Sequence, residues 1–307
     1  MTLALIFPGQ GAQEPGMGRG LLDAGAPAHD LALEASEIAG RDLVRLACEG
    51  SAEELRATEV AQPLLLLQSV ALLALLPQTT RSAAVAVAGH SLGEYSALVA
   101  AGSLDWQDAL RLVQARGLAM SQASSPDQGM SAVLALEEAA VAAAIDTHRE
   151  DGLVAVVANF NAPGQVVVSG HTALLERLVE PLKAAGARRV MGLQVGGAFH
   201  SPLMAAAAER LAAAIDEAPL HDGSPQAFNI DGRVRTAVPE IAAALKGQLT
   251  APVRWVECVR SLAALGVDQF FELGPGSTLS ALGRRILPDA SWNSAATPDA
   301  ARSAGAA

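Results

Sequence analysis

The sequence has few cysteines and few aromatic residues, and each shortage excludes a class of protein. Its 307 residues include two cysteines, Cys48 and Cys258, which are far apart and match neither a metal-binding nor a redox spacing. The six histidines form no HExxH or other paired motif, so no metal site is expected. Aromatic residues make up 3% of the chain, which leaves few platforms on which single-stranded nucleic acid could stack.

The charge balance and the absence of long apolar runs limit the partners further. The formal net charge is −11, from 32 acidic and 21 basic residues, which disfavours a broad nucleic-acid surface. The N-terminus lacks a basic region and a small-residue cleavage site. The most apolar stretch, Pro63 to Leu76, is too short to span a bilayer. We therefore expect a cytoplasmic protein with no nucleic-acid and no membrane partner.

Short apolar runs that alternate with helical periods predict an α/β fold. Leu3 to Phe7 is typical of a buried strand, and the alternating Ala and Val of 83–88 are typical of a buried parallel strand. A third strand is expected at 268–273. Helices are expected at roughly 30–48, 52–58, 63–76, 93–101, 105–122, after 201, at 238–248 and finally from the 274–276 turn to about 286.

A segment in the middle of the chain changes character and predicts an inserted domain. Residues 126–196 read as strand, helix, strand, strand, helix and strand, the split-βαβ order of a ferredoxin-like domain. We therefore expect a hydrolase-like, parallel-sheet main domain formed by 1–125 and 197–287. The remaining residues, 288–307, are rich in Ala, Ser and Pro without an apolar period, which predicts a disordered tail.

Residues 89–93, Gly-His-Ser-Leu-Gly, match the G-x-S-x-G pattern of a nucleophile elbow. A predicted strand precedes the motif and a predicted helix follows it, which is the context that exposes the Ser91 hydroxyl. The backbone N–H groups that follow, starting at Leu92, lie at a helix N-terminus and could stabilise a negatively charged oxygen. A structural turn with an incidental serine is the alternative interpretation.

A serine nucleophile needs a base, and His200 is the best candidate. Four other histidines lie in polar or loop settings, and the side chain of His90 is expected to diverge from that of Ser91 at a tight bend. His200 follows a run of small residues and precedes a helix. A surface-exposed loop histidine remains the simpler interpretation of this position taken alone.

A second glycine loop, at residues 9–13, follows the first predicted strand. Dinucleotide binding would require a third glycine three places after Gly11, where the sequence has Glu14. In an elbow fold, the loop after another strand supplies the second oxyanion donor. The backbone N–H of Gln10 is our candidate for that donor.

Five motifs together resemble one family, the malonyl-CoA:acyl carrier protein transacylases. The resemblance covers nearly the whole chain, in order, to about residue 286. The motifs are Phe-Pro-Gly-Gln-Gly-Ala-Gln at 7–13, Gly-His-Ser-Leu-Gly-Glu-Tyr-Ser-Ala-Leu at 89–98, Asn-Ala-Pro-Gly-Gln at 161–165, Gly-Ala-Phe-His-Ser at 197–201 and Glu-Leu-Gly-Pro-Gly at 272–276.

The resemblance implies a ping-pong acyl transfer by a Ser–His dyad. Ser91 matches the nucleophile and His200 the general base. Gln248 matches the residue whose backbone carbonyl orients the histidine in place of an aspartate. The oxyanion hole corresponds to the backbone N–H groups of Gln10 and Leu92, in agreement with the reading of the two loops.

The resemblance also implies which acyl group is selected. Arg116, 25 positions after Ser91, matches the arginine that binds the malonyl carboxylate, although its spacing alone favours an exposed helix arginine. A guanidinium pairs with a carboxylate through two parallel hydrogen bonds. Gln62 matches a pocket residue. Phe199 matches the residue before the histidine that is phenylalanine in malonyl-selective and serine in methylmalonyl-selective relatives.

The same family implies the partners of the reaction. Malonyl-CoA is the donor, the phosphopantetheine thiol of an acidic acyl carrier protein is the acceptor, and no metal or nucleotide cofactor is bound. We expect a monomer. Because the chain is also acidic, carrier docking requires a local basic patch. The candidates for this patch are Lys183, Arg188, Arg189, Arg284 and Arg285.

Other functions remain open at this point. A polyketide acyltransferase and the malonyltransferase subunit of a malonate decarboxylase share the chemistry. A serine esterase or thioesterase would have an acidic partner for His200 and would hydrolyse its acyl-enzyme rapidly. A carrier-docking module without catalysis would never be acylated on Ser91.

Overall fold

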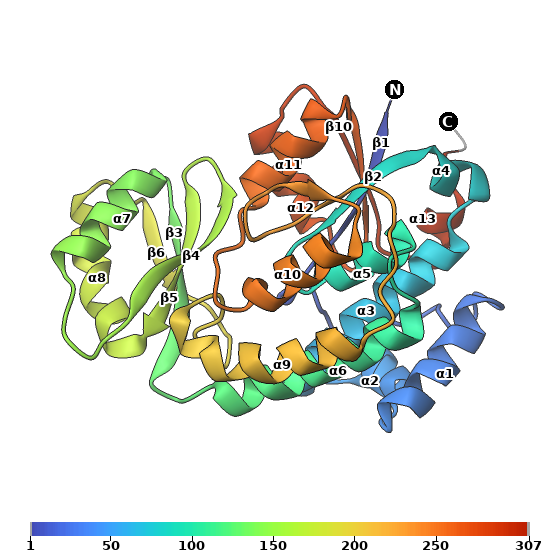
Figure 1. Ribbon diagram of the computed structural model, residues 1–307, viewed down its shortest axis with the longest axis horizontal. Helices are drawn as coiled ribbons and strands as arrows, with labels where there is room; N and C mark the ends of the chain where they lie inside the picture. The colour runs from blue at the N-terminus through green and yellow to red at the C-terminus, as the bar shows by residue number, and fades with distance from the viewer. Residues whose placement is uncertain (1, 306–307) are drawn as a thin grey trace.

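The computed structural model describes residues 2–305 and has a large lobe and a small lobe (Figure 1). The large lobe is built on a six-stranded sheet with the order β10-β9-β1-β2-β7-β8. All neighbouring strands are parallel except β7 and β8. The strands are β1 (Leu3–Phe7), β2 (Ala84–Gly89), β7 (Gln226–Ala227), β8 (Val234–Arg235), β9 (Gln269–Leu273) and β10 (Ser291–Ala295). The predicted α/β class with a parallel sheet is confirmed.

Helices cover both faces of this sheet, because alternate side chains of each strand point to opposite faces. In β1, Leu5 and Phe7 join one apolar cluster, whereas Ala4 and Ile6 join the other. The second cluster is covered by α11 (Trp255–Ala264) and α12 (Thr278–Ile286). The first is covered by α1 (Ala28–Ala39), α2 (Leu43–Glu49), α3 (Thr58–Leu75), α5 (Gly93–Ala101), α6 (Trp106–Ala123), α9 (Ala205–Glu217), α10 (Val238–Gln248) and α13 (Pro298–Arg302).

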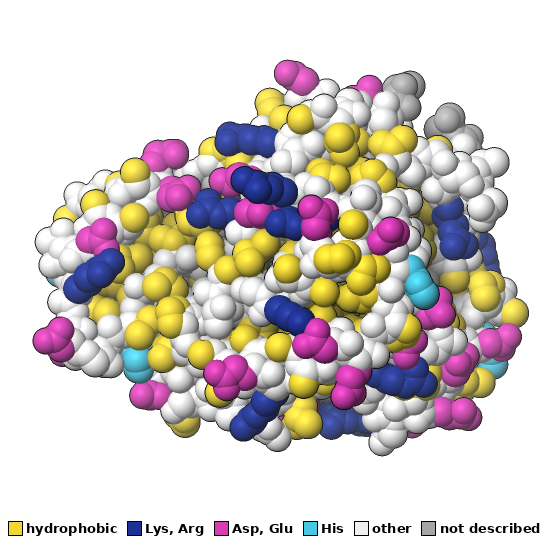
Figure 2. All heavy atoms as spheres, viewed as in Figure 1, with side chains coloured by type: hydrophobic (Ala, Val, Ile, Leu, Met, Phe, Trp, Pro, Cys, Tyr) yellow, Lys and Arg dark blue, Asp and Glu magenta, His cyan; other side chains and the backbone are white. Residues whose placement is uncertain are grey.

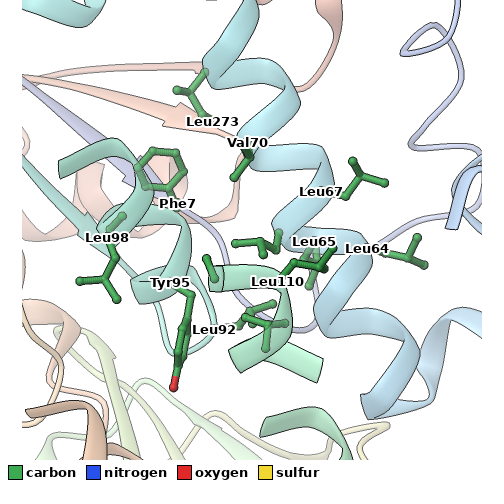
Figure 3. Packing of buried hydrophobic residues seen from close by; sticks show 14 of the residues in the cluster. Phe7, Leu64, Leu65, Leu67, Val70, Leu92, Tyr95, Leu98, Leu110 and Leu273 are labelled. Atoms are coloured by element: carbon green, nitrogen blue, oxygen red, sulfur yellow. The ribbon is translucent and has the colours of Figure 1, made fainter. Parts of the chain in front are cut away.

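Helix α3 runs through the centre of the first cluster (Figure 3). It begins at Thr58, five residues before the predicted start, and Pro63 lies inside it. With 18 residues and a mean hydropathy of 1.5, α3 is long and apolar enough to cross a membrane, so our expectation about its length is wrong. However, 83% of this window is buried inside the fold, which is typical of a core helix.

The small lobe contains the six predicted elements in the predicted order. They are β3 (Gln128–Leu134), α7 (Glu138–Thr147), β4 (Ala155–Ala162), β5 (Gln165–His171), α8 (Thr172–Ala184) and β6 (Arg189–Gly192). The strands form an antiparallel sheet with the order β4-β5-β3-β6, and a separate apolar cluster lies beneath it. The exact limits of the two domains stay a prediction.

The prediction of a disordered tail after residue 287 is wrong. Residues 291–295 form β10, which extends the sheet in parallel with β9, and α13 follows. Trp292 is buried and stacks on Phe270, with ring centroids 4.1 Å apart. The segment has too few apolar residues to show a strand or helix period in the sequence. It forms a strand because it pairs with the edge strand β9. Residues 306 and 307, which end the predicted tail, lie outside the described residues.

Several short elements have no counterpart in the sequence prediction. Most are too short to show a hydrophobic period, whereas α11 is long enough and was missed despite its buried face. They are α4 (Gln78–Ala83), β7, β8 and α11, whereas η1 (Glu54–Arg56) falls within the predicted helix at 52–58 and η2 (Pro202–Met204) opens the predicted helix after 201.

Replacing Trp292 tests whether the C-terminal segment belongs to the fold. We expect Trp292→Ala to lower the free energy of unfolding by about 3–5 kcal/mol, because it empties a buried aromatic site. Denaturant unfolding measures this loss. Asn293→Ala, an exposed change on the same strand, is the control and should alter stability by less than about 0.5 kcal/mol. Equal stability of the two variants would indicate a loose tail after all.

Candidate active site

Ser91 lies at the sharp bend between β2 and α5. Its φ of 52° is in the left-handed region, which L-residues adopt only under constraint. Glycines make the bend possible: a Cβ on Gly89 would lie 1.9 Å from the carbonyl carbon of Gly93. A Cβ on Gly93 would lie 2.1 Å from the carbonyl oxygen of Phe7. The two glycines of the predicted elbow are therefore needed because backbone passes within contact of both.

The side chain of Asn229 stabilises this bend through hydrogen bonds to its backbone. Its Oδ1 accepts a hydrogen bond from the backbone N–H of Ser91 at 2.6 Å, and its Nδ2 donates to the carbonyl of Gly89 at 2.8 Å. The side chain is fully buried. Asn229 follows β7, 138 positions after Ser91, and sequence reasoning missed it because no local motif marks it.

His200 contacts the Ser91 hydroxyl directly. The distance from Ser91 Oγ to His200 Nε2 is 2.7 Å. The Nδ1 of His200 lies 3.1 Å from the carbonyl oxygen of Gln248 and 3.2 Å from that of Ala251. Carbonyl oxygens accept only, so Nδ1 carries the proton and Nε2 is left to accept one from Ser91.

The protonation state of His200 suits a base. The ring is buried, and its burial together with the nearby charge of Arg116 lowers the pKa of His200 to about 3. The imidazole is therefore neutral near neutral pH. His90, as expected, points elsewhere: its Nε2 lies 2.8 Å from Asn161 Oδ1 and its ring packs against Trp255.

Two backbone N–H groups beside Ser91 have no hydrogen-bond partner within residues 2–305. They belong to Gln10, in the loop after β1, and to Leu92, the residue after Ser91. Gln10 lines the same cavity as Ser91 and His200. Unpaired donors that face a reacting oxygen are what an oxyanion hole requires.

Arg116 is buried next to Ser91, not exposed on its helix. Its side chain is 1% exposed, and its Nη2 donates to Ser91 Oγ at 3.0 Å. Further hydrogen bonds run from Nη2 to Gln248 Oε1 at 3.0 Å and from Nη1 to Gln62 Oε1 at 2.8 Å. Across residues 2–305, no carboxylate lies within ion-pair distance of this guanidinium. The simple interpretation of an exposed arginine is wrong.

The side chain of Gln62 lies behind Arg116. It is fully buried in α3, and its Nε2 donates to Met120 Sδ at 3.2 Å and weakly to Gln10 Oε1 at 3.5 Å. Gln62 therefore contacts the guanidinium and not the cavity. Gln62 was predicted to be a substrate-pocket residue, and any effect of its side chain on the acyl group would be indirect, through its hydrogen bond with Arg116.

The cavity over Ser91 lies between the two lobes and has a volume of about 210 Å³. The large lobe contributes Ser91, His200, the glycine loop and the nearly buried ring of Phe199. The small lobe and its connection contribute mainly apolar side chains: Met130, Val167, Leu193 and Val195, with the amides of Asn159 and Asn161. A narrow, largely apolar chamber that ends at a serine suits the acylation of that serine.

The described residues contain no group of three or more His, Cys, Asp or Glu side chains that could hold a metal ion. The groups gathered at Ser91 are a hydroxyl, an imidazole, a guanidinium and free backbone donors. Together these groups can perform nucleophilic substitution at a carbonyl.

Known proteins resemble the chain over most of its length. The family model described as acyl transferase domain matches residues 4–302. The malonyl CoA-acyl carrier protein transacylase of Escherichia coli strain K12 is 41% identical over 286 residues, which cover 92% of each chain. An acyl carrier protein S-malonyltransferase from Vibrio cholerae has a crystal structure with 39% identity and a TM-score of 0.91, covering 96% of this chain and 97% of its own.

A third similar structure contains a partner. It is a malonyl-transacylase in complex with a type II PKS acyl-carrier protein, PlMCAT:AntF. The match has 37% identity and a TM-score of 0.94 and covers 99% of each chain.

The pKa of His200 leads to a prediction about pH. We expect the rate at which a fluorophosphonate labels Ser91 to stay level between about pH 5 and about pH 7, because a pKa near 3 keeps the imidazole neutral over this range. The base form is lost only as the pH falls through that value. A histidine with an ordinary pKa of about 6.5 would make the rate rise roughly 25-fold over the same range.

This rate is measured by quenching the labelling reaction at a series of times and determining the intact mass of the protein. His200→Ala is the control and should remove the labelling at every pH. A rate that rises steeply between the two ends of the range would contradict the buried, neutral histidine.

Proposed function

The chain belongs to the acyl transferase family, and on that premise we propose that it transfers a malonyl group from malonyl-CoA to the phosphopantetheine thiol of an acyl carrier protein. The transfer passes through a malonyl ester of Ser91. The observation that carries this proposal is the buried Arg116 guanidinium, which contacts the Ser91 hydroxyl and has no carboxylate of its own. It supplies the charge that a dicarboxylic acyl group requires at the nucleophile.

In the first half-reaction, Nε2 of His200 takes the proton of the Ser91 hydroxyl as Oγ attacks the thioester carbonyl. The backbone N–H groups of Gln10 and Leu92 stabilise the negative oxygen of the tetrahedral intermediate. The carbon–sulfur bond then breaks, and the coenzyme A sulfur takes the proton from His200. Carbonyl oxygens at residues 248 and 251 keep the imidazole oriented throughout.

The second half-reaction reverses these steps with a new thiol. His200 takes the proton of the phosphopantetheine thiol, and the sulfur attacks the ester carbonyl of malonyl-Ser91. The bond from the carbonyl carbon to Oγ breaks, and Oγ recovers the proton from His200. Every proposed group lies in one chain, so the mechanism requires no bound metal, nucleotide cofactor or second subunit.

Selection of the malonyl group is assigned to Arg116 and Phe199. The guanidinium would accept the free carboxylate in a bidentate pair, for which an acetyl group offers no equivalent. The ring of Phe199 lines the cavity next to His200, where it would crowd an α-methyl branch. Both roles are proposals from the geometry and from the resemblance of these positions.

The observation against a serine esterase is the partner of His200. That alternative expects an acidic side chain at Nδ1, whereas two backbone carbonyls occupy this position. A malonyltransferase subunit of a malonate decarboxylase shares the chemistry, so these contacts do not distinguish it from the proposed function.

Mass spectrometry of the acyl-enzyme tests the proposed function. The protein is mixed with a panel of acyl-CoAs, the modified peptide is identified, and holo acyl carrier protein or water is then added. We expect malonyl on Ser91, stable in water and discharged by the carrier. No label on Ser91 would reject the transferase, and rapid loss in water would favour the esterase.

Removing Arg116 should change the choice of acyl group. We expect Arg116→Ala to lower the rate constant for malonyl loading by at least about a hundredfold, while acetyl loading changes far less, because only malonyl loses an ionic partner. Quantitative intact-mass analysis with the two donors measures the ratio. Arg111→Ala, an exposed arginine on the same helix, is the control and should leave the ratio unaltered. An unaltered ratio in Arg116→Ala would remove this residue from substrate selection.

Carrier docking is assigned to a basic pocket formed by Arg188, Arg189 and Arg285. These three arginines line a depression of about 410 Å³ at the boundary between the lobes. Figure 2 shows Lys and Arg side chains near the boundary between the lobes, interspersed with Asp and Glu side chains. The helix that carries Arg285, α12, also lines the Ser91 cavity.

Two other candidates for the docking patch have partners inside the chain. Lys183 pairs with Glu180, and Arg284 donates to the carbonyl of Trp292 at 3.1 Å. Arg188 and Arg189 are exposed and have no ion-pair partner among residues 2–305. Arg285 donates to Gln165 and to the carbonyl of Pro163, so we propose that Arg188 and Arg189 supply the charge of the basic pocket that an acidic carrier would meet.

Charge reversal in the basic pocket should separate the two half-reactions. We expect Arg188→Glu/Arg189→Glu to lower the rate constant for transfer to the carrier by about tenfold or more at low salt, while Ser91 is still loaded by malonyl-CoA. Lys183→Glu is the control, with a smaller expected effect. Equal transfer by the double variant and the wild type would exclude this surface.

A further inference from the structure

Glu94 is a buried carboxyl in the first turn of α5 that the reaction described above does not use. It is 1% exposed and lies three residues after Ser91. Its Oε1 accepts a hydrogen bond from the backbone N–H of Asn229, and its Oε2 accepts one from Nε2 of Gln248. Both partners also hold the Ser91 bend, so Glu94 lies directly behind the active site.

The side-chain amide of Gln248 links Glu94 to Arg116. Its Oε1 accepts from Nη2 of Arg116 at 3.0 Å, and its Nε2 donates both to Glu94 and to the carbonyl oxygen of Ser91, the latter at 2.9 Å. Guanidinium nitrogens only donate, whereas the oxygens of Ser91 and Glu94 accept here, so one orientation of the amide satisfies all three contacts. The opposite orientation would set N–H groups of Gln248 and Arg116 against each other.

The amide also separates the carboxyl of Glu94 from the guanidinium of Arg116. Arg116 is held by two amide oxygens and a hydroxyl, all of them neutral. Glu94 is the carboxyl whose charge acts on Arg116, yet Gln248 lies between them and no direct ion pair forms. A direct bidentate pair would occupy the donors that a substrate carboxylate needs.

The electrostatic state of Glu94 agrees with this arrangement. Burial raises the pKa of Glu94 to about 8, against the opposing effects of its hydrogen bonds and of Arg116. Arg235, the other cation that acts on Glu94, is itself paired with Asp231. Near neutral pH, Glu94 therefore neither cancels the guanidinium charge fully nor strongly repels a second carboxylate.

We infer that Glu94 is a positioning residue for substrate selection, which acts through the side chain of Gln248 to hold Arg116 in place while leaving its guanidinium free for an acyl carboxylate. This inference rests on the proposed function. Glu94 touches neither substrate nor reacting atom. Its effect should appear in the choice between donors and not only in the overall rate.

The conservative change Glu94→Gln tests this role. Glutamine can accept at only one of its two terminal atoms, whereas Glu94 accepts from both Asn229 and Gln248. We expect the ratio of malonyl to acetyl loading rate constants on Ser91 to fall about tenfold or more, because a displaced guanidinium no longer meets the carboxylate. The probes are malonyl-CoA and acetyl-CoA.

A second buried glutamate provides the matched control. Glu272 is 0% exposed and accepts from the backbone N–H groups of Leu279 and Ser280, away from Arg116. We expect Glu272→Gln to lower the melting temperature but to leave the loading ratio within about twofold of the wild type. A merely structural Glu94 would behave as Glu272 does, with both donors affected equally, and that result would overturn the inference.

Gln248→Met identifies the route of the effect. Methionine has a similar length and keeps the backbone carbonyl that orients His200, but it lacks the amide. We expect this variant alone to lower the ratio. Adding Glu94→Gln should lower the ratio by no more than about twofold further, because both changes break the same series of hydrogen bonds from Glu94 through Gln248 to Arg116. A full additional effect of Glu94→Gln would show that Glu94 acts without Gln248.

The variants keep this inference separate from the proposed function. A wild-type protein that takes no malonyl on Ser91 would remove the proposed function, and the inference with it. A malonyl-selective wild type whose ratio is unchanged in Gln248→Met would remove the inference alone, even if Glu94→Gln failed to fold.

Discussion

The structure depends most on how it stabilises one buried positive charge, the guanidinium of Arg116. A buried guanidinium without a carboxylate is costly, and its burial lowers the pKa of Arg116. The chain compensates with neutral acceptors from three separate segments: Gln62 on α3, Gln248 at the end of α10 and the hydroxyl of Ser91. The Nε of Arg116 has no hydrogen-bond partner among the described residues. Because Nη2 of Arg116 also donates to Ser91 Oγ at 3.0 Å, we propose that an anionic acyl group on Ser91 meets this cation.

The same segments also constrain Ser91, the proposed nucleophile, so the contacts of Arg116 and of Ser91 depend on the same residues. Gln248 orients His200 with its backbone and Arg116 with its side chain. Asn229 holds the N–H of Ser91 and the carbonyl before the bend, which keeps a residue with φ of 52° in place. Because these contacts join the end of α10, the loop after β7 and the elbow, the site forms only when the large lobe is folded. The small lobe then closes the cavity with apolar side chains.

Much of this arrangement could be predicted from the sequence where the signal is local. A short motif predicts the strand, glycine bend and helix around Ser91. Six consecutive segments with strand or helix patterns predict the small lobe. The burial of Arg116 does not follow from its helix, because the acceptors that permit it lie 54 and 132 positions away. Asn229 and the link from Glu94 to Gln248 are equally non-local. The tail was mistaken for disorder because β10 gains its stability from β9 and from the stacking of Trp292, neither of which a five-residue segment reveals.

The central claim is that Arg116 receives the free carboxylate of the acyl group at Ser91, and the crystal structure of the malonyl-Ser91 acyl-enzyme tests it most directly. We expect both carboxylate oxygens to lie within about 3 Å of guanidinium nitrogens of Arg116. We also expect Gln248 to bridge Arg116 and Glu94 as before. A malonyl carboxylate that points to solvent, with Arg116 still bonded to Ser91 Oγ, would contradict it.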